Sequence, residues 1–149
     1  MRTCDECNLR FCSPRLSEEN IVSLYGEDYY VFSKSDESYF TRTAEIYDRT
    51  INLLDQSEVL PKRVAEVGSG KGYLLALLKE LGWDVYGIEI STSAADYAKS
   101  KFGVDSFAGK IEDYFSSGTQ LDPFSVVLGV DIIEHVPDPD QVVSDLARL

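Results

Sequence analysis

Three glycines at alternate positions, Gly68, Gly70 and Gly72, lie between a short apolar segment and a helical pattern. Glycine allows a ligand to approach the backbone closely because it has no side chain. The first turn of the helix that follows also presents N–H groups without partners inside the helix. This turn is therefore predicted to bind a ligand through its main chain, beside the acid Glu66 that precedes it.

A second acid, Glu89, stands at the end of the next predicted strand, about twenty residues after Gly68. A carboxylate at this strand end can accept hydrogen bonds from both hydroxyls of a ribose, whereas the alternative is a merely exposed strand-end acid. The turn and the acid together predict a ligand that contains adenosine. A dinucleotide-binding turn would need its third glycine at position 73, where the chain has Tyr73. A nicotinamide-dependent oxidoreductase is therefore the disfavoured alternative.

A third set of chemically active residues follows the fourth predicted strand, in the segment DIIEHVPDP. In an open α/β sheet, ligands bind beyond the carboxyl ends of the strands, so Asp131 and His135 are predicted to lie at or near the site. His135 is the only histidine in the chain, and its usual pKa suits a general base. The alternative is a histidine that orders the loop by hydrogen-bonding nearby backbone.

Strands and helices alternate along residues 38–149, which is typical of a doubly wound parallel sheet. Periodic apolar residues predict a helix from Ser38 to Leu54, with a buried face formed by Phe40, Ala44, Tyr47, Ile51 and Leu54. Strands are predicted at 63–67, 84–90, 104–107 and 124–130, with helices at 73–81, 92–102 and from about 140. Right-handed crossovers would place the helices on both faces of this α/β sheet.

The composition is that of an ordinary globular protein, with 44% hydrophobic and 27% charged residues among 149. No apolar run is long enough to cross a bilayer, and the first residues lack the apolar stretch of a secretory leader. The predicted compartment is therefore the cytoplasm. A net charge of −12 argues against a broad nucleic-acid-binding surface, which needs Lys and Arg to neutralise phosphates.

The segments EVGSGKG, GIEIS and DIIEHVPDP, in this order and spacing, resemble the class I S-adenosylmethionine-dependent methyltransferases of the small-molecule type. The resemblance covers about residues 39–149 and is greatest to the group with an EHVPDP-like signature. It implies a Rossmann-like fold and the transfer of a methyl group from S-adenosylmethionine to an O, N or C atom of a small-molecule acceptor. That acceptor would be a sugar or a natural-product intermediate.

The resemblance also implies roles for individual residues. Glu66, Gly68, Gly70 and Gly72 would line the methionine part of the cofactor, Glu89 would hold the ribose, and Ile90, Lys110 and Ile111 would lie around the adenine. Asp131 would lie beside the transferred methyl group, and both Asp131 and His135 are candidate catalytic residues. The N-terminal aromatic residues would cover the cofactor or simply pack their segment onto the domain: Tyr25, Tyr29, Tyr30 and Phe32.

An N-terminal segment, residues 1–37, is expected to be separate from the methyltransferase domain at 38–149 and irregular apart from a short helix at Ser17–Leu24. Its sequence CDECNLRFCSP resembles half of a zinc-ribbon module. Cys4 and Cys7 would form a half-site, with Cys12 as a candidate third ligand, so zinc would need ligands from outside this chain. Free thiols are the favoured interpretation.

The predicted sheet has four strands, whereas the resembled fold has seven, so we expect a domain truncated after the fourth strand. An unpaired strand edge would favour pairing with another chain, and a homo-oligomer is therefore a candidate assembly. A non-catalytic fragment that binds an adenosyl ligand is the alternative from outside the enzymes.

Overall fold

The computed structural model describes residues 1–149 apart from 12, 15, 26–34 and 120. At the N-terminus, β1 (Arg2–Thr3) and β2 (Arg10–Phe11) form a small antiparallel hairpin. Helix α1 (Glu18–Leu24) follows, as predicted, and the Ser17 hydroxyl accepts a hydrogen bond from the Asn20 N–H at its start. The prediction of an otherwise irregular segment was wrong, because it did not include the hairpin, whose two-residue strands are too short to show a pattern.

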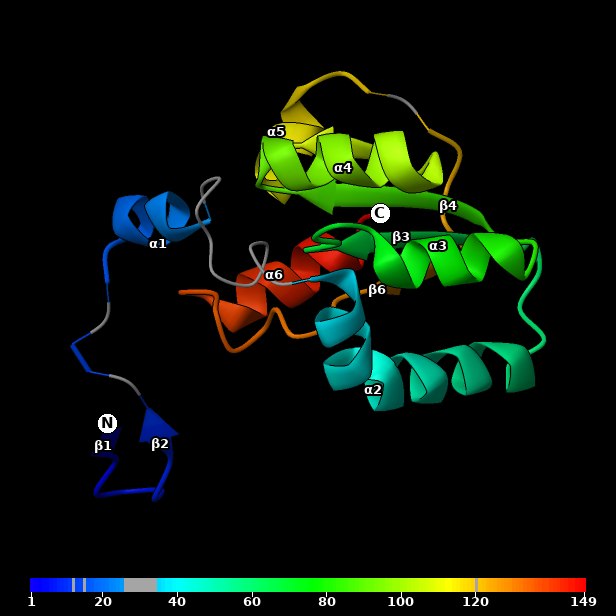
Figure 1. Cartoon of the computed structure of the whole chain (residues 1–149). Coiled ribbons are helices and arrows are strands. Elements are labelled where there is room, and N and C mark those ends of the chain that lie inside the picture. The colour runs from blue at the N-terminus through cyan, green and yellow to red at the C-terminus, as the bar shows by residue number, and fades with distance from the viewer. Residues whose placement is uncertain (12, 15, 26–34, 120) are drawn as a thin grey trace.

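A four-stranded parallel sheet forms the centre of the molecule (Figure 1). Its strands are β3 (Arg63–Val67), β4 (Asp84–Glu89), β5 (Asp105–Ala108) and β6 (Val126–Leu128), in the order β5-β4-β3-β6. The chain moves outward from β3 to β5 and then returns to place β6 on the other side of β3. This reversal confirms the doubly wound α/β fold and creates a topological switch point between the carboxyl ends of β3 and β6.

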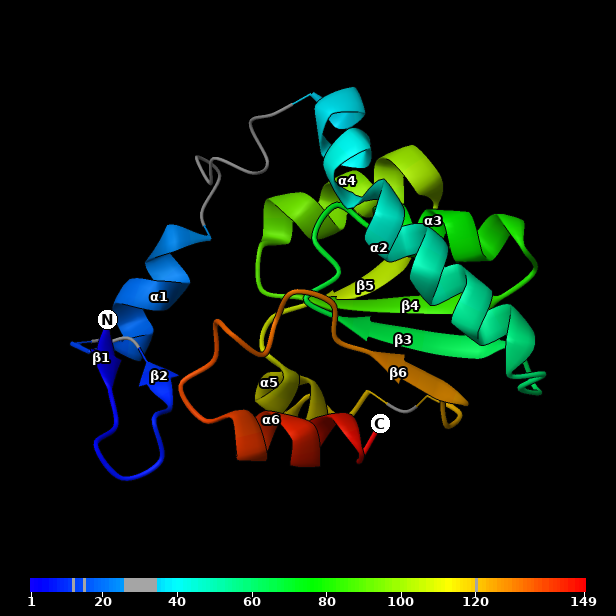
Figure 2. The same ribbon diagram turned by 90° about the horizontal axis from the view of Figure 1, so that it is seen from below.

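Helices cover both faces of the sheet (Figure 2). On one face lie α2 (Asp36–Gln56), α3 (Tyr73–Glu80) and α4 (Thr92–Phe102), and on the other lie α5 (Ile111–Ser116) and α6 (Pro139–Leu146). Each layer has its own hydrophobic cluster, one centred on the α3 leucines and the other on Ile88, Ile111 and Tyr114. Both faces of the sheet are therefore sealed, and only the strand ends remain for a ligand.

Helix α2 differs in two respects from the sequence-based prediction. It begins earlier, because the Ser35 hydroxyl, and not that of Ser38, caps it by accepting a hydrogen bond from the Ser38 N–H at 3.3 Å. Its buried face includes Thr43, which is 5% exposed, whereas Ala44 faces solvent. Thr43 lies one turn before the buried Tyr47, so it continues the same helical stripe.

Helix α5 was missed by the sequence analysis, and β6 is shorter than the predicted strand at 124–130. Six residues make fewer than two helical turns, which is too short for a clear 3.6-residue period. The residues of β6 are only partly buried, because this strand lies at the sheet edge and pairs with β3 alone.

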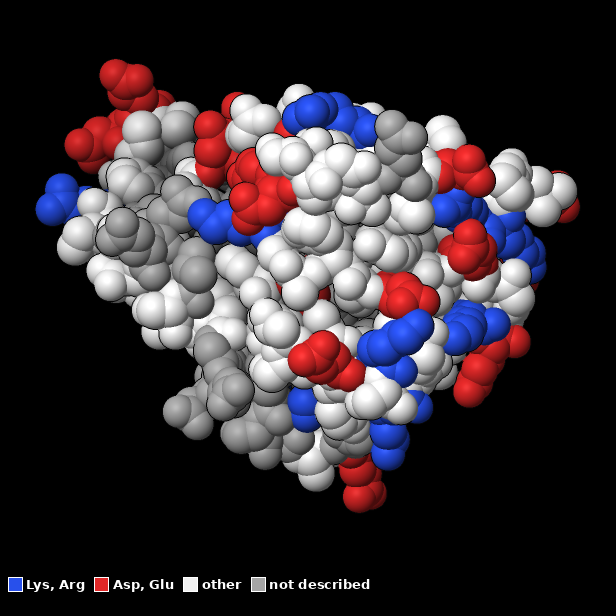
Figure 3. Space-filling view, turned by 90° about the horizontal axis from the view of Figure 1, so that it is seen from above, with Lys and Arg blue, Asp and Glu red and all other residues white. Residues whose placement is uncertain are grey.

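Charged side chains of both signs are interspersed over the face of the molecule that Figure 3 presents. Within the described part of the chain, no helix combines the length and apolar character that a membrane-spanning segment needs.

We expect Gly72→Ala to destabilise the protein more than Gly82→Ala. Both glycines have left-handed backbone conformations, with φ of 75° and 83°, so both substitutions strain the backbone by about 1 kcal/mol. A Cβ at position 72 would also lie 2.8 Å from Cβ of Ala98, whereas a Cβ at position 82 would meet nothing within 4 Å. Urea unfolding should therefore show an additional loss of about 1–3 kcal/mol for Gly72→Ala. Equal losses would contradict this packing of α3 against α4.

Candidate functional site

A narrow crevice opens at the switch point between β3 and β6. Its wall from the sheet side includes Glu66 at the end of β3 and Gly68 and Ser69 of the glycine-rich turn. Residues after β6 and residues of α2 complete the lining: Val130, Asp131, Thr43, Ile46 and Tyr47. The cavity has a volume of about 30 Å³, room for about one or two waters, so a larger ligand requires some of these side chains to move.

Glu66 is a buried acid that faces this crevice. Its side chain comes from a central strand and is 4% exposed. Its Oε2 atom has no hydrogen-bond partner among the described residues. Burial, and secondarily the negative charge of Glu89, raise the pKa of the Glu66 carboxyl to about 8. A neutral carboxyl tolerates such a place far better than a charged one.

Glu89 is the acid that holds the glycine-rich turn in place. Its Oε2 accepts a hydrogen bond from the Gly70 N–H at 2.7 Å, and its Oε1 accepts one from the Ser91 N–H at 2.8 Å. Burial raises the pKa of this carboxyl, while the backbone donors oppose that rise. A carboxylate has about four acceptor sites, so Glu89 keeps acceptor capacity for a ligand in addition to these bonds.

A small polar layer lies between the turn and the sheet. The hydroxyls of Ser69 and Ser106 are buried there, and neither has a hydrogen-bond partner among the described residues. Gly87 of β4 makes room for them, since a Cβ at that position would lie 2.6 Å from Ser69 Oγ and 2.3 Å from Ser106 Oγ. Acids and hydroxyls therefore lie beneath this turn, in addition to the apolar contact that Gly72 makes with Ala98.

Asp131 also lines the crevice, on the segment that follows β6. It is exposed and has a φ of 50°, a left-handed conformation that Asp adopts more readily than most residues. The predicted base, His135, is four residues further along. Its side chain is 52% exposed and does not line the crevice, and its Nε2 lies 3.9 Å from Glu134 Oε1. Its catalytic role stays a prediction.

The remaining predicted ligand residues lie around the strand ends without lining the crevice. Gly72 starts α3 and packs against Ala98 of α4. Ile90 follows β4 and is half-buried, and Lys110 starts α5. Ile111 is 6% exposed and belongs to the hydrophobic cluster beneath the sheet.

Sequence reasoning missed the contribution of α2 and of Ser69 to the crevice. Tyr47 was placed on the buried face of its helix, and that assignment could have suggested its contact with the strand ends. Thr43 and Ile46 carried no such signal, because their position over the switch point depends on how α2 crosses the sheet. The aromatic residues Tyr29, Tyr30 and Phe32 lie outside the described residues.

Cys4 and Cys7 lie in the turn of the β1–β2 hairpin. Hydrogen bonds from the backbone of Cys7 and Glu6 lower the pKa of the Cys4 thiol. Among the described residues, which do not include Cys12, no group of three metal-ligating side chains gathers anywhere. Zinc binding with ligands from outside this chain therefore stays a prediction.

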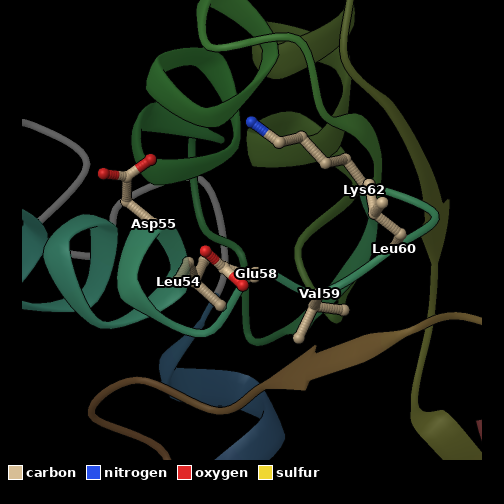
Figure 4. Close-up of a pocket in the computed structure, with 6 residues that line it drawn as sticks. All are labelled: Leu54, Asp55, Glu58, Val59, Leu60 and Lys62. Carbon is tan, nitrogen blue, oxygen red and sulfur yellow. The ribbon is translucent and has the colours of Figure 1, made fainter.

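A second, more open hollow lies at the end of α2, where the chain turns towards β3 (Figure 4). It has a volume of about 250 Å³ and is lined by Leu54, Asp55, Glu58, Val59, Leu60 and Lys62. This hollow adjoins the start of β3, whereas ligands of doubly wound sheets bind at the carboxyl ends of the strands. The smaller crevice is therefore the better candidate site despite its size.

The doubly wound sheet with a glycine-rich turn after its first strand defines a Rossmann-like domain. Comparison with known proteins identifies the family within this class. The family profile described as "Methyltransferase domain" matches residues 39–149. The chain belongs to this methyltransferase family.

Individual relatives agree with this assignment. The chain is 32% identical over 119 residues to a ubiquinone biosynthesis O-methyltransferase of Hahella chejuensis, covering 76% of this chain and 49% of the relative. It is 34% identical over 91 residues to a protein-L-isoaspartate O-methyltransferase of Alkalilimnicola ehrlichii, covering 58% and 40%. The chain thus spans about half the length, or less, of these relatives.

The fold is also similar to a solved structure, that of magnesium protoporphyrin IX methyltransferase from Synechocystis PCC 6803 with bound S-adenosylmethionine. The TM-score is 0.69 at 18% identity, and the match covers 93% of this chain and 74% of the other. A Rossmann-like fold is therefore confirmed independently of sequence identity.

The buried Glu66 predicts an unusual dependence of stability on pH. Between the ordinary pKa of 4.5 and the raised value of about 8, the folded state retains a proton that the unfolded state has lost. Stability is therefore highest below this window and falls as pH rises through it. Relative to Glu66→Gln, the wild type should lose about 1 kcal/mol of unfolding free energy per pH unit.

Urea unfolding at several pH values from 5 to 9 measures this difference. Glu112→Gln, at an exposed acid of α5, is the matched control and should leave the pH profile of the wild type unchanged. Parallel profiles for the wild type and Glu66→Gln would contradict the burial of a protonated carboxyl.

Proposed function

We propose that this protein binds S-adenosylmethionine in the crevice at the β3–β6 switch point and transfers its methyl group to a small-molecule acceptor. The observation that carries the proposal is the crevice itself, which a glycine-rich turn borders and whose lining includes the acids Glu66 and Asp131. Family membership and the cofactor bound to the magnesium protoporphyrin IX enzyme support it.

The residues present fit this cofactor. The ammonium group of its amino-acid end and its sulfonium are positively charged, and the lining includes two carboxyl groups and, within the described part of the chain, no Lys, Arg or His. Glu66 Oε2 and Ser69 Oγ are buried polar atoms in need of partners, which a polar ligand would supply. Glu89 has acceptor capacity left for the ribose hydroxyls.

The cofactor supplies an already activated methyl group, so the work of the protein is to hold and orient. Glu89 keeps the glycine-rich turn fixed to β4, which preserves a main-chain surface for the ligand. Glu66 and Asp131 provide negative charge on two sides of the crevice. Thr43, Ile46 and Tyr47 form the α2 wall, and they exclude water from the methionine end.

The acceptor is proposed only as a small molecule, because the relatives differ in the substrates that their names imply. In the proposed reaction, His135 accepts a proton from the nucleophile and Asp131 helps to orient it. His135 must approach the crevice for this, and its 52% exposed side chain is free of the packing that would prevent rotation. We place the enzyme in the cytoplasm and retain pairing through the β6 edge as its mode of self-association.

An oxidoreductase is disfavoured by the surroundings of position 73. Tyr73 is 2% exposed and lies in an aromatic cluster, with ring centroids 4.6 Å from Phe40 and 5.5 Å from Phe102. A dinucleotide turn uses glycine at this place to bring helix and strand close together. Here a large ring fills the space.

Calorimetric titration with S-adenosylhomocysteine, the demethylated product of the cofactor, tests the proposal. We expect saturable binding to the wild type and at least about a hundredfold loss of affinity in Glu89→Ala, because two backbone N–H donors lose their acceptor and the turn is released. Glu112→Ala, at an exposed acid, should bind as the wild type does. Circular dichroism would verify that both variants are folded.

NADH serves as the competing ligand in the same titration. Binding of NADH in place of S-adenosylhomocysteine would overturn the proposed function in favour of an oxidoreductase. Binding of neither by the folded wild type would also contradict a working cofactor site in this chain.

A further inference from the structure

Two buried acids lie on neighbouring strands near the glycine-rich turn, and they differ in how many hydrogen bonds their carboxyl oxygens accept. Glu66 and Glu89 lie on neighbouring strands, β3 and β4, and each is 4% exposed. Glu89 accepts hydrogen bonds from two backbone N–H groups. Glu66 Oε2 has no partner among the described residues.

This inequality determines where a proton resides. Two like charges this deeply buried repel each other, so the pair is more stable with one member neutral. The backbone donors stabilise the charged form of Glu89, whereas no described group donates a hydrogen bond to the buried Oε2 atom of Glu66. Glu66 is therefore the neutral member, and the rise of its pKa to about 8 agrees with this assignment.

The other groups around Glu66 do not neutralise it. Asp131, which lines the same crevice, adds further negative charge, and Tyr47 from α2 contributes a phenol. Arg63, three residues earlier in β3, is the cation nearest in sequence, and its Nε lies 2.9 Å from Asp84 Oδ2. Lys71 follows five residues after Glu66, and its Nζ lies over the Tyr97 ring, 4.8 Å from the centroid. The described residues that line the crevice include no Lys, Arg or His, so a ligand cation would bring the positive charge that this lining lacks.

We propose that Glu66 is protonated in the empty crevice and releases this proton to solvent when the ammonium group of the cofactor's amino-acid end enters. The carboxyl O–H bond breaks, the proton passes to buffer, and the resulting carboxylate is the counter-ion of the ligand. Ligand binding is thus linked to the release of one proton. This inference rests on the proposed function, because it assigns a cationic ligand to the crevice.

A titratable acid at position 66 suits both the ligand-free and the ligand-bound protein. A permanently charged Glu66 beside Glu89 would destabilise the empty state, whereas a permanently neutral residue would give no counter-charge. A titratable acid provides both states. The consequence is that affinity should rise with pH until Glu66 is already ionised in the empty protein.

Calorimetric titration with S-adenosylhomocysteine in phosphate and in Tris, which differ in ionisation enthalpy, counts the protons released. At pH 7 the wild type should release about 0.9 proton, and its affinity should rise about tenfold per pH unit below pH 7. Glu66→Gln should bind more weakly and show neither buffer-dependent heat nor this rise. Asp131→Asn is the matched control, since it removes the other crevice carboxyl and should retain the proton release.

The outcomes separate this inference from the proposed function. Saturable binding with the same enthalpy in both buffers would overturn the proton release and leave the cofactor site intact. Absence of binding would overturn both. Carbon-13 NMR of the labelled Glu carboxyl groups in the ligand-free protein is a second test: one signal should titrate near pH 8 and be missing in Glu66→Gln. If every Glu signal titrates below pH 6, the proposal is wrong.

Discussion

The Glu89 carboxylate is the contact on which the site depends. It joins the Gly70 N–H of the glycine-rich turn to the Ser91 N–H at the start of α4, across the end of β4. Turns rich in glycine have little conformational preference of their own, and backbone entropy opposes their order. One buried acid therefore gives this turn a fixed shape before any ligand is present. The ribose-binding role that resemblance assigns to Glu89 would be an addition to this structural one.

The polar layer beneath the turn shows how binding capacity is obtained at a cost in stability. Glu66, Ser69 and Ser106 each have a buried polar atom without a hydrogen-bond partner among the described residues, and each such atom costs free energy comparable to a lost hydrogen bond. The surrounding packing compensates, since Leu74, Leu75 and Leu78 of α3 and Val64 and Ala65 of β3 are almost fully buried. A ligand that forms hydrogen bonds with these atoms would offset part of that cost. The stability given up in the empty site would then contribute to the affinity for the ligand.

The sequence predicted the fold well where hydrophobic periodicity and the residues that end helices and strands indicate the same bounds. The helix predicted at 92–102 is α4 and the strand predicted at 63–67 is β3, each with the predicted bounds. The acids at the strand ends were also recognised, because parallel strands bring their carboxyl ends to one edge. The way in which α2 crosses the sheet could not be predicted from the sequence pattern. Thr43 and Ile46 reach the crevice through tertiary packing. The sequence does not indicate which residues a buried threonine of α2 contacts. The sequence also did not indicate that Gly72 packs against Ala98, whereas its predicted role in binding the cofactor stays a prediction.

The central claim is that a ligand binds above the β3–β6 switch point, and amide chemical-shift mapping by NMR tests it most directly. On addition of S-adenosylhomocysteine, the account predicts that the amides of Gly68, Gly70, Ser91 and Asp131 shift in a saturable manner. The amides of Leu60 and Lys62, beside the larger hollow at the start of β3, should not shift. Shifts confined to that hollow, with the glycine-rich turn unaffected, would contradict the account.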